Sequence, residues 1–322
     1  MMGKVTLKNG EPLPKIGFGT FGSDHYSPAQ VAKAVEYAIE SGYRLFDCAQ
    51  VYGNEDFIGE VFDGAFKRGI VSREEIFVTS KVWNDMHGVG KPAEALGQTL
   101  TDLRLDYVDS YFVHWPFPNY HAPGCDGESR NPDSVPFDPE SYIRLWSEME
   151  SLYDAGLTRS LGMSNMTIIK LKAVLERIRV QPAMIEMELH PSFQQRELFE
   201  YCADREIKVI GFCPLGSPNR PERDVAPEDV SDMELEEVRK IARSRNVHPA
   251  AVCLMWAANR GVIPIPFSGN EKNIQANLRA VISKLTDEEM AVLDSAERNC
   301  RLVKGQVFLW PGAKSWKELW DE

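Results

Sequence analysis

The chain of 322 residues lacks any long hydrophobic run, although 43% of its residues are hydrophobic. A helix that spans a bilayer needs about 18 or more consecutive apolar residues. The first fifteen residues carry a polar turn, from Lys8 to Glu11, where a secretory signal would have an apolar stretch. We therefore expect a protein that does not enter a membrane and that is located in the cytoplasm.

Metal sites, disulfides and basic tracts are also missing from the sequence. The six cysteines include no CxxC pair and no Cys/His cluster at metal-ligand spacing, which predicts reduced thiols and no metal. Lys and Arg form no long run, and the formal net charge is -12. Because this charge repels nucleic acids and anionic lipids, we expect neither as a partner. The sequence leaves the oligomeric state open.

An N-terminal β-hairpin is predicted from Asn9-Gly10, which tolerates positive φ and lies between two short apolar runs. After it, short runs rich in β-branched and apolar residues alternate with segments of helical period. The eight predicted strands are residues 16–20, 44–49, 76–81, 107–114, 158–164, 183–189, 208–214 and 262–264. Helices are predicted at 54–67, 92–103, 139–155, 167–178, 194–205, 233–245 and 249–259, and after capping boxes at Ser27/Gln30 and Thr286/Glu289.

Strands that alternate with helices pair in parallel. Eight such units in about 250 residues favour a closed barrel over an open sheet. No linker, internal repeat or change in composition divides the chain, and two long irregular stretches remain, 117–138 and 301–322. We therefore predict an α/β fold, a (β/α)₈ TIM barrel with an N-terminal β-hairpin, as a single domain over residues 1–322.

Four polar side chains are the candidate catalytic group. Asp47, Lys81 and His114 fall toward the C-terminal ends of different predicted strands. Tyr52 lies in the loop after the first of these strands. Barrel active sites are built on that face. Taken singly, each side chain also has an ordinary structural interpretation, as a helix cap, a half-buried ring, a surface ammonium or a buried imidazole.

Together, the four side chains match what reduction of a carbonyl requires. Hydride arriving at the carbonyl carbon leaves negative charge on oxygen, so an acid must protonate that oxygen. A tyrosine of ordinary pKa, about 10, is a weak acid at neutral pH. A nearby Lys81 ammonium would lower the pKa of Tyr52, and Asp47 would hold the ammonium charged and oriented. His114 would donate a hydrogen bond to the carbonyl oxygen.

Six short motifs follow one another near predicted strand ends. They are Phe46-Asp47-Cys48-Ala49, Tyr52-Gly53-Asn54-Glu55, Thr79-Ser80-Lys81, Val113-His114-Trp115-Pro116, Gly162-Met163-Ser164-Asn165 and Pro214-Leu215-Gly216-Ser217. With them the sequence resembles the aldo-keto reductase family, of the aldose and aldehyde reductase kind, over nearly its whole length. The resemblance implies that Tyr52 is the general acid/base, tuned by Lys81 and Asp47, and that His114 orients the substrate. It also implies a hairpin that closes the barrel bottom.

No GxGxxG motif follows a strand and opens a helix, so a Rossmann site is not supported. The resemblance instead implies NADP or NAD bound across the barrel mouth. Glu186 stands where the family usually has a glutamine that binds the carboxamide, and a carboxylate there can accept a hydrogen bond but cannot donate one. The resemblance assigns Ser164, Asn165 and Glu186 to the carboxamide, Phe212 to the nicotinamide ring, and Leu215, Gly216 and Ser217 to the pyrophosphate.

The segment 263–277 resembles the part of the family that binds the adenosine end of the cofactor. Members that prefer NADP usually place Lys and Arg where this chain has Phe267 and Asn273. Lys272 is the nearest substitute charge for a 2′-phosphate, and it is equally well interpreted as a solvated helix residue. NADP and NAD therefore both remain expected cofactors. Ser268 and Asn277 are the other residues assigned to this end.

By alignment, Phe21, Trp83 and Trp115 surround the mouth of the substrate pocket. Aromatic walls with one polar cluster suit aldehydes and small sugars. Each ring can equally be part of ordinary barrel packing, above all Trp83. A cation in the stretch 117–138, such as Arg130, is either a site for an acidic or phosphorylated sugar or a solvated loop charge.

The function expected from these observations is an NAD(P)H-dependent oxidoreductase that reduces an aldehyde, aldose or ketone to the alcohol, in either direction. A Schiff-base lyase that uses Lys81 is one alternative, since desolvated lysines form imines with carbonyl substrates. A noncatalytic cofactor-binding subunit on the same fold is another, since fold alone does not settle function.

Overall fold

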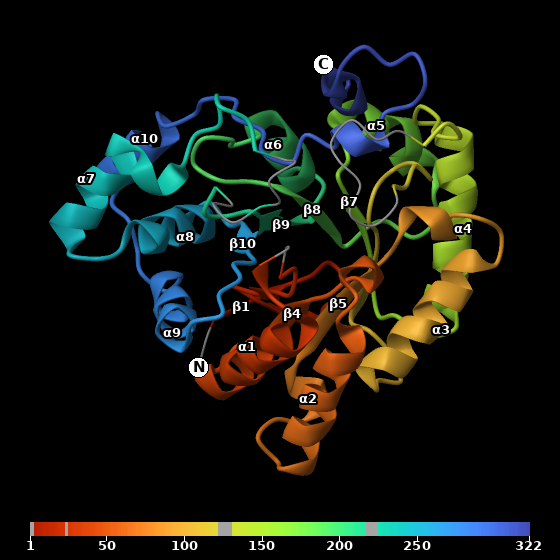
Figure 1. Cartoon of the computed structure of the whole chain (residues 1–322), viewed down its shortest axis with the longest axis horizontal. Coiled ribbons are helices and arrows are strands. Elements are labelled where there is room, and N and C mark those ends of the chain that lie inside the picture. The colour runs from red at the N-terminus through yellow and green to blue at the C-terminus, as the bar shows by residue number, and fades with distance from the viewer. Residues whose placement is uncertain (1–2, 23–24, 122–130, 217–219, 221–224) are drawn as a thin grey trace.

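The computed structural model describes residues 3–22, 25–121, 131–216, 220 and 225–322. Within those residues, eight parallel strands follow one another around the sheet in chain order, and helices surround them (Figure 1). This confirms the predicted α/β barrel, although its first and last strands are shorter than predicted. The strands are β3 (Phe18–Gly19), β4 (Leu45–Asp47), β5 (Phe77–Val82), β6 (Ser110–Val113), β7 (Leu161–Ser164), β8 (Met184–Glu188), β9 (Lys208–Phe212) and β10 (Ile263–Pro264).

Backbone hydrogen bonds join the first strand to the last. Gly17 donates its N–H to the Pro264 carbonyl at 3.0 Å, and Gly19 donates to the Pro266 carbonyl at 3.1 Å. A Cβ at Gly19 would lie 2.9 Å from the backbone oxygen of Ile265, so this approach requires a residue without a side chain. The barrel closes at this seam.

The capping boxes predicted at Ser27 and Thr286 are both present. One helix ends earlier than predicted because the chain tightens into a 3-10 turn at Leu175–Arg177, and another begins later because a 3-10 turn occupies Asp232–Glu234. The α-helices are α1 (Pro28–Ser41), α2 (Glu55–Lys67), α3 (Lys91–Leu103), α4 (Pro139–Asp154), α5 (Ile168–Val174), α6 (Arg196–Ala203), α7 (Glu236–Arg245), α8 (Pro249–Asn259), α9 (Glu271–Ala280) and α10 (Asp287–Asp294).

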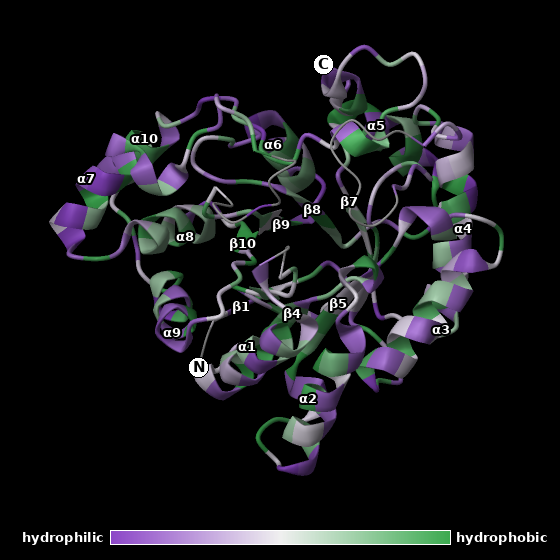
Figure 2. Ribbon diagram, in the orientation of Figure 1, coloured by the Kyte–Doolittle hydropathy of each residue, from purple (hydrophilic) through white to green (hydrophobic). Residues whose placement is uncertain are grey.

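Helix burial follows the apolar pattern of each segment. Helix α7 buries only one stripe, Val238, Ile241 and Ala242, and it is mainly hydrophilic in Figure 2. Every residue from Val252 to Ala257 of α8 is buried, and α8 contacts both α7 and β10. Among the helices that the structure describes, none is long and apolar enough to cross a bilayer.

The predicted N-terminal hairpin is present as β1 (Lys4–Thr6) and β2 (Pro12–Pro14), which pair antiparallel. Leu7 and Leu13 of this hairpin are buried in one apolar cluster with residues of the strands. These partners include the first residues of several strands, Leu45, Phe77, Met184 and Ile263. The hairpin therefore closes the end of the barrel opposite the candidate site.

The C-terminal stretch 301–322 packs on the barrel. It contains two 3-10 helices, Gln306–Phe308 and Trp316–Trp320. Lys170 of α5 donates to the Leu319 carbonyl at 2.8 Å and helps to fix this stretch. We call residues 301–322 the C-terminal tail. Its apolar cluster with the loop after β6 consists of Trp115, Phe117, Val307, Phe308, Leu309, Leu319 and Trp320.

Candidate active site

Asp47 and Lys81 form a buried ion pair at the C-terminal ends of β4 and β5. Lys81 Nζ donates to both carboxylate oxygens of Asp47 at 2.7 Å and to the Cys48 carbonyl at 3.0 Å. Thr79 Oγ1 donates to Asp47 Oδ1 at 2.6 Å. The Lys81 side chain is fully buried, and these three bonds occupy all the donors of its ammonium. Its position is therefore fixed.

Tyr52 and His114 lie next to this pair. Tyr52 ends a 3-10 turn, Gln50–Tyr52, and Lys81 Nζ lies 5.3 Å from the centroid of its ring. His114 follows β6, and its ring centroid is 5.9 Å from that of Tyr52, with the rings nearly perpendicular at 82°. The structure thus brings together the four residues that the sequence singled out, on the face where the strands end.

Burial dominates the electrostatics of this group. It raises the pKa of Tyr52 above the ordinary value, and the opposing effect of Lys81 is smaller. Lys81 lowers the pKa of Tyr52 as expected, but burial outweighs the ammonium, so the net shift of this pKa is upward. Burial alone would lower the pKa of Lys81, but Asp47 and Glu186 raise it well above its ordinary value. Burial and the charge of Lys81 hold the pKa of His114 well below its ordinary value, so the imidazole is neutral.

The residues assigned to the carboxamide of the cofactor lie beside this group. Asn165, after β7, has a left-handed backbone with φ 58°, and its Nδ2 donates to the His114 carbonyl at 2.9 Å and to Ser164 Oγ at 3.2 Å. Asn165 Oδ1 and Glu186 Oε2 are buried without a hydrogen-bond partner among the described residues. Two unused acceptors fit the NH₂ of a nicotinamide carboxamide.

The residues assigned to the nicotinamide ring and the pyrophosphate follow one another at the end of β9. Phe212 is the last residue of that strand, and it is partly exposed, as is Leu215. Gly216 has φ 72°, and a Cβ there would lie 2.9 Å from Asp232 Oδ2. Backbone without a side chain allows close approach to a phosphate. Ser217 lies outside the described residues.

The residues assigned to the adenosine end lie just before α9 and along it. Lys272 and Asn273 are exposed in its first turn, where backbone N–H groups and the helix dipole favour an anion. Phe267 packs its ring 5.0 Å from that of Tyr26, so it lines this region with apolar surface. The other two residues are Ser268, which is partly exposed, and Asn277, which is buried.

Two of the predicted pocket aromatics face the catalytic candidates. The ring of Phe21 lies 5.1 Å from that of Tyr52, and the ring of Trp83 lies 5.0 Å from that of His114. Trp115 is buried, and its ring lies 4.6 Å from that of Phe308. Trp115 therefore packs against the C-terminal stretch 301–322.

Two further rings belong to this aromatic wall, Phe308 and His121, and the sequence did not predict this position for either. Phe308 of the C-terminal tail lies 5.8 Å from Trp83 and 5.4 Å from His121, between ring centroids. The stretches 117–138 and 301–322 are both long and irregular, but nothing in their patterns predicts that they meet. The aromatic content of the tail was the available signal. Arg130, the candidate cation, lies outside the described residues.

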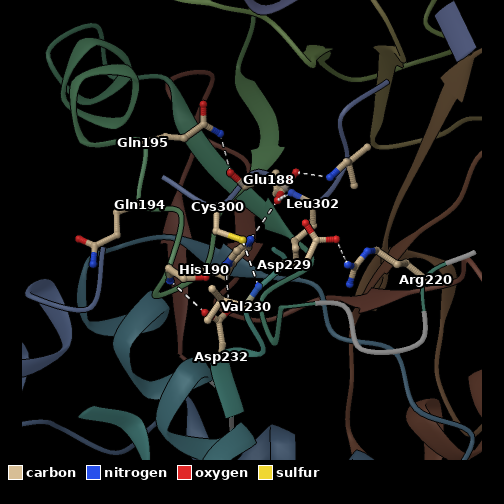
Figure 3. A network of polar contacts seen from close by, with 12 residues as sticks. Glu188, His190, Gln194, Gln195, Arg220, Asp229, Val230, Asp232, Cys300 and Leu302 are labelled. Atoms are coloured by element: carbon tan, nitrogen blue, oxygen red, sulfur yellow. Dashed lines mark hydrogen bonds and ion pairs between the residues drawn. The ribbon is translucent and has the colours of Figure 1, made fainter. Parts of the chain in front are cut away.

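A second buried ion cluster lies further along β8 (Figure 3). His190 Nε2 is 2.9 Å from Glu188 Oε1, and His190 Nδ1 is 2.8 Å from Asp232 Oδ2. The backbone N–H groups of Leu302 and Val303 donate to the two Glu188 oxygens at 2.7 and 2.9 Å. The cluster therefore ties the segment before α7 and the tail to the barrel.

Comparisons with known proteins agree with this geometry. Residues 15–298 match the model of the Aldo/keto reductase family. The chain is 38% identical over 320 residues to Aldo/keto reductase slr0942 of Synechocystis sp., covering 98% of this chain and 95% of that protein. It is 38% identical over 303 residues to Aldo-keto reductase family 1 member A1 of Gallus gallus, covering 93% and 90%. It is 36% identical over 320 residues to Aldo-keto reductase family 1 member A1-A of Danio rerio, covering 99% and 96%. The chain therefore belongs to the aldo/keto reductase family of oxidoreductases.

Proposed function

We propose that this protein is an NAD(P)H-dependent reductase that converts an aldehyde, an aldose or a ketone to the alcohol, and that the reaction is reversible. One observation carries the proposal. The Lys81 ammonium is bound to Asp47 and lies 5.3 Å from the ring of Tyr52, and the neutral His114 borders the same space. This arrangement supports an acid, its charge partner and a neutral donor acting on one carbonyl oxygen.

The proposed roles follow from protonation states. A bound nicotinamide cofactor supplies the hydride to the carbonyl carbon. Tyr52 is protonated at neutral pH, so it can give its phenolic proton to the oxygen. Burial raises its pKa and opposes this transfer, whereas the charge of Lys81 favours it. Lys81 then stabilises the phenolate that remains, and Asp47 keeps Lys81 charged and in place. His114 donates a hydrogen bond that orients the carbonyl.

NADP and NAD are both proposed cofactors. The unused acceptors of Asn165 and Glu186 support a nicotinamide carboxamide at the barrel mouth. The exposed Lys272, at the positive end of α9, supports a 2′-phosphate and hence NADP. Phe267 and Asn273, which carry no charge, support NAD. Because the tail packs on the barrel, we also treat residues 1–322 as one domain.

Schiff-base chemistry at Lys81 is disfavoured. Imine formation needs a free amine. The Lys81 ammonium makes three hydrogen bonds, and its carboxylate neighbours raise its pKa well above the ordinary value.

The test is a panel of aldehydes, aldoses and ketones with NADPH and with NADH, following cofactor absorbance and identifying the product. We expect cofactor oxidation and formation of the corresponding alcohol with at least one carbonyl class. Tight cofactor binding without turnover on the whole panel would instead support a noncatalytic subunit. Borohydride trapping of a ketone on Lys81, seen by mass spectrometry, would support the lyase.

A further inference from the structure

Glu186 is a buried carboxyl that contacts the catalytic candidates but is not saturated by them. It lies in β8 and is 3% exposed. Its Oε2 lies 3.5 Å from Lys81 Nζ, yet this oxygen has no hydrogen bond among the described residues. The donors of Lys81 are already taken by Asp47 and the Cys48 carbonyl. Glu186 therefore keeps an acceptor available toward the assigned carboxamide site.

The groups that face Glu186 leave its charge finely balanced. Asp47 from β4 repels a negative charge on it, and Lys81 from β5 attracts one. Tyr52 is protonated at neutral pH, and Glu188, next on the same face of β8, is paired with His190. Burial and Asp47 raise the pKa of Glu186 well above its ordinary value, against the pull of Lys81. A single nearby charge can therefore change the protonation state of this carboxyl.

The nicotinamide ring carries a positive charge in only one of its two redox states, so only that state can act on Glu186 as a nearby charge. The ring is cationic when it is oxidised and neutral when it is reduced. An opposite charge within about 4–6 Å favours the ionised form of a carboxyl, typically by 1–3 pKa units. An oxidised ring beside Glu186 would favour the carboxylate, whereas a reduced ring would not.

We propose that Glu186 selects the redox state of the bound cofactor, because its carboxylate holds oxidised nicotinamide more tightly than reduced nicotinamide and oxidised cofactor therefore expels a proton when it binds. The inference rests on the proposed function, since it needs a nicotinamide ring at this site. Its consequence concerns direction: at alkaline pH, the bound oxidised cofactor is favoured and alcohol oxidation is assisted.

The sign of the pH dependence follows from linkage. Oxidised cofactor binds best to the deprotonated form, so its affinity rises with pH while Glu186 of the free protein is still protonated. The affinity levels off once the pH exceeds the raised pKa of Glu186, where the carboxyl is ionised in both the free and the bound protein. The slope cannot exceed about tenfold per pH unit, since one proton is released. The affinity for reduced cofactor lacks this contribution.

The test is a set of fluorescence or calorimetric titrations of the whole protein with NAD⁺, NADH, NADP⁺ and NADPH between pH 6 and 9. The wild type is compared with Glu186→Gln, which removes the charge and keeps the shape. We expect the ratio of reduced to oxidised dissociation constants to rise about tenfold or more with pH in the wild type. In Glu186→Gln the ratio should stay flat. Calorimetry in buffers of different ionisation enthalpy should detect proton release with oxidised cofactor in the wild type alone.

Glu55→Gln is the matched control. Glu55 is also a buried carboxyl, bonded by Ser80 Oγ at 2.6 Å and Thr99 Oγ1 at 2.9 Å, and burial raises its pKa to about 7. Its variant should keep the pH dependence of the wild type. Cofactor binding with the same pH-dependent ratio in wild type and Glu186→Gln would overturn the inference alone. Failure of the wild type to bind any of the four cofactors would overturn the proposed function itself.

Discussion

Strand β8 contributes one carboxylate to each of two buried ion clusters, and the two clusters differ in how completely they are paired. Glu186 joins Asp47 around the Lys81 ammonium. Glu188 joins Asp232 around the His190 imidazole. Each cluster has two carboxyl groups and one cationic group, and all of these side chains are almost entirely buried.

The clusters differ in what remains unused. In the second cluster both oxygens of Glu188 accept backbone N–H groups of the tail, and Asp232 Oδ1 accepts the N–H of Ser192 at 2.9 Å (Figure 3). In the first, Glu186 Oε2 makes no hydrogen bond among the described residues and lies 3.5 Å from Lys81 Nζ, and a tyrosine borders the ammonium. Asp232 Oδ2 of the second cluster also makes no hydrogen bond among these residues, but it lies closer to its cation, 2.8 Å from His190 Nδ1. A buried cluster whose carboxylates are held by close cation and backbone contacts holds segments together, whereas a more loosely paired one at the barrel mouth is available for chemistry.

The largest expected effect is on catalysis, from the first cluster. Replacing Lys81 by methionine, Lys81→Met, removes the charge that stabilises a Tyr52 phenolate. We expect kcat to fall by about 100- to 10,000-fold, the usual contribution of general acid-base catalysis. Steady-state rates with NADPH and a carbonyl from the panel measure it.

Lys170→Met is the control for Lys81→Met. Lys170 is also a buried lysine, 2% exposed, but it binds Asp321 and the tail away from Tyr52. Its loss should reduce stability and leave kcat within about tenfold of the wild type. Equal losses of kcat in both variants would mean that any buried lysine matters and that Lys81 has no special role.

The second cluster should respond in stability. His190→Gln leaves Glu188 and Asp232 without a cation between them, which should cost about 3–5 kcal/mol in the free energy of unfolding. Denaturant titration measures this cost. In the absence of denaturant, His190→Gln should still bind the cofactor. An unfolding midpoint equal to that of the wild type would show that the cluster does not stabilise the fold.

The pH dependence of that loss has a definite sign. Burial alone would lower the pKa of His190, but Asp232 and Glu188 raise it to about 10. Stabilisation by a group of raised pKa is full below its unfolded value and is lost as pH rises through the folded value. The stability gap between wild type and His190→Gln should therefore be widest near pH 6 and shrink toward pH 10.

The smallest expected effect concerns the tail, which the second cluster fixes. Phe308→Ala removes a ring that contacts Trp83, Trp115 and His121. Each aromatic pair is worth about 0.5–1.5 kcal/mol, so we expect KM for the carbonyl to rise roughly tenfold with little change in kcat. Phe66→Ala, on the outer helix α2, is the control and should leave KM unchanged.

The sequence predicted the barrel and the first cluster better than the second. Asp47, Lys81 and His114 fall at strand ends, and a parallel barrel brings all its strand ends to one face. Glu188 and His190 are close in the chain, but their partner Asp232 is brought in by a loop whose path no periodicity encodes. The contact between the tail and residue 121 is missed for the same reason.

The sequence also could not predict the balance between burial and nearby charges, which sets the pKa values in the candidate active site. The sequence indicated that Lys81 would lower the pKa of Tyr52, and it does, but burial has the larger and opposite effect. The extent of burial depends on how loops and strand ends pack. Likewise, Glu186 could be assigned to the carboxamide by position, but its 3.5 Å approach to Lys81 appears only in three dimensions.

The most direct test of the central claim is the hydride-transfer rate of Tyr52→Phe in single turnovers with bound NADPH. The variant keeps the ring, which lies 5.1 Å from Phe21, and loses only the hydroxyl. We predict a fall of at least about 100-fold with an unchanged NADPH dissociation constant and unfolding midpoint. Transfer at the wild-type rate would contradict the assignment of Tyr52 as the proton donor.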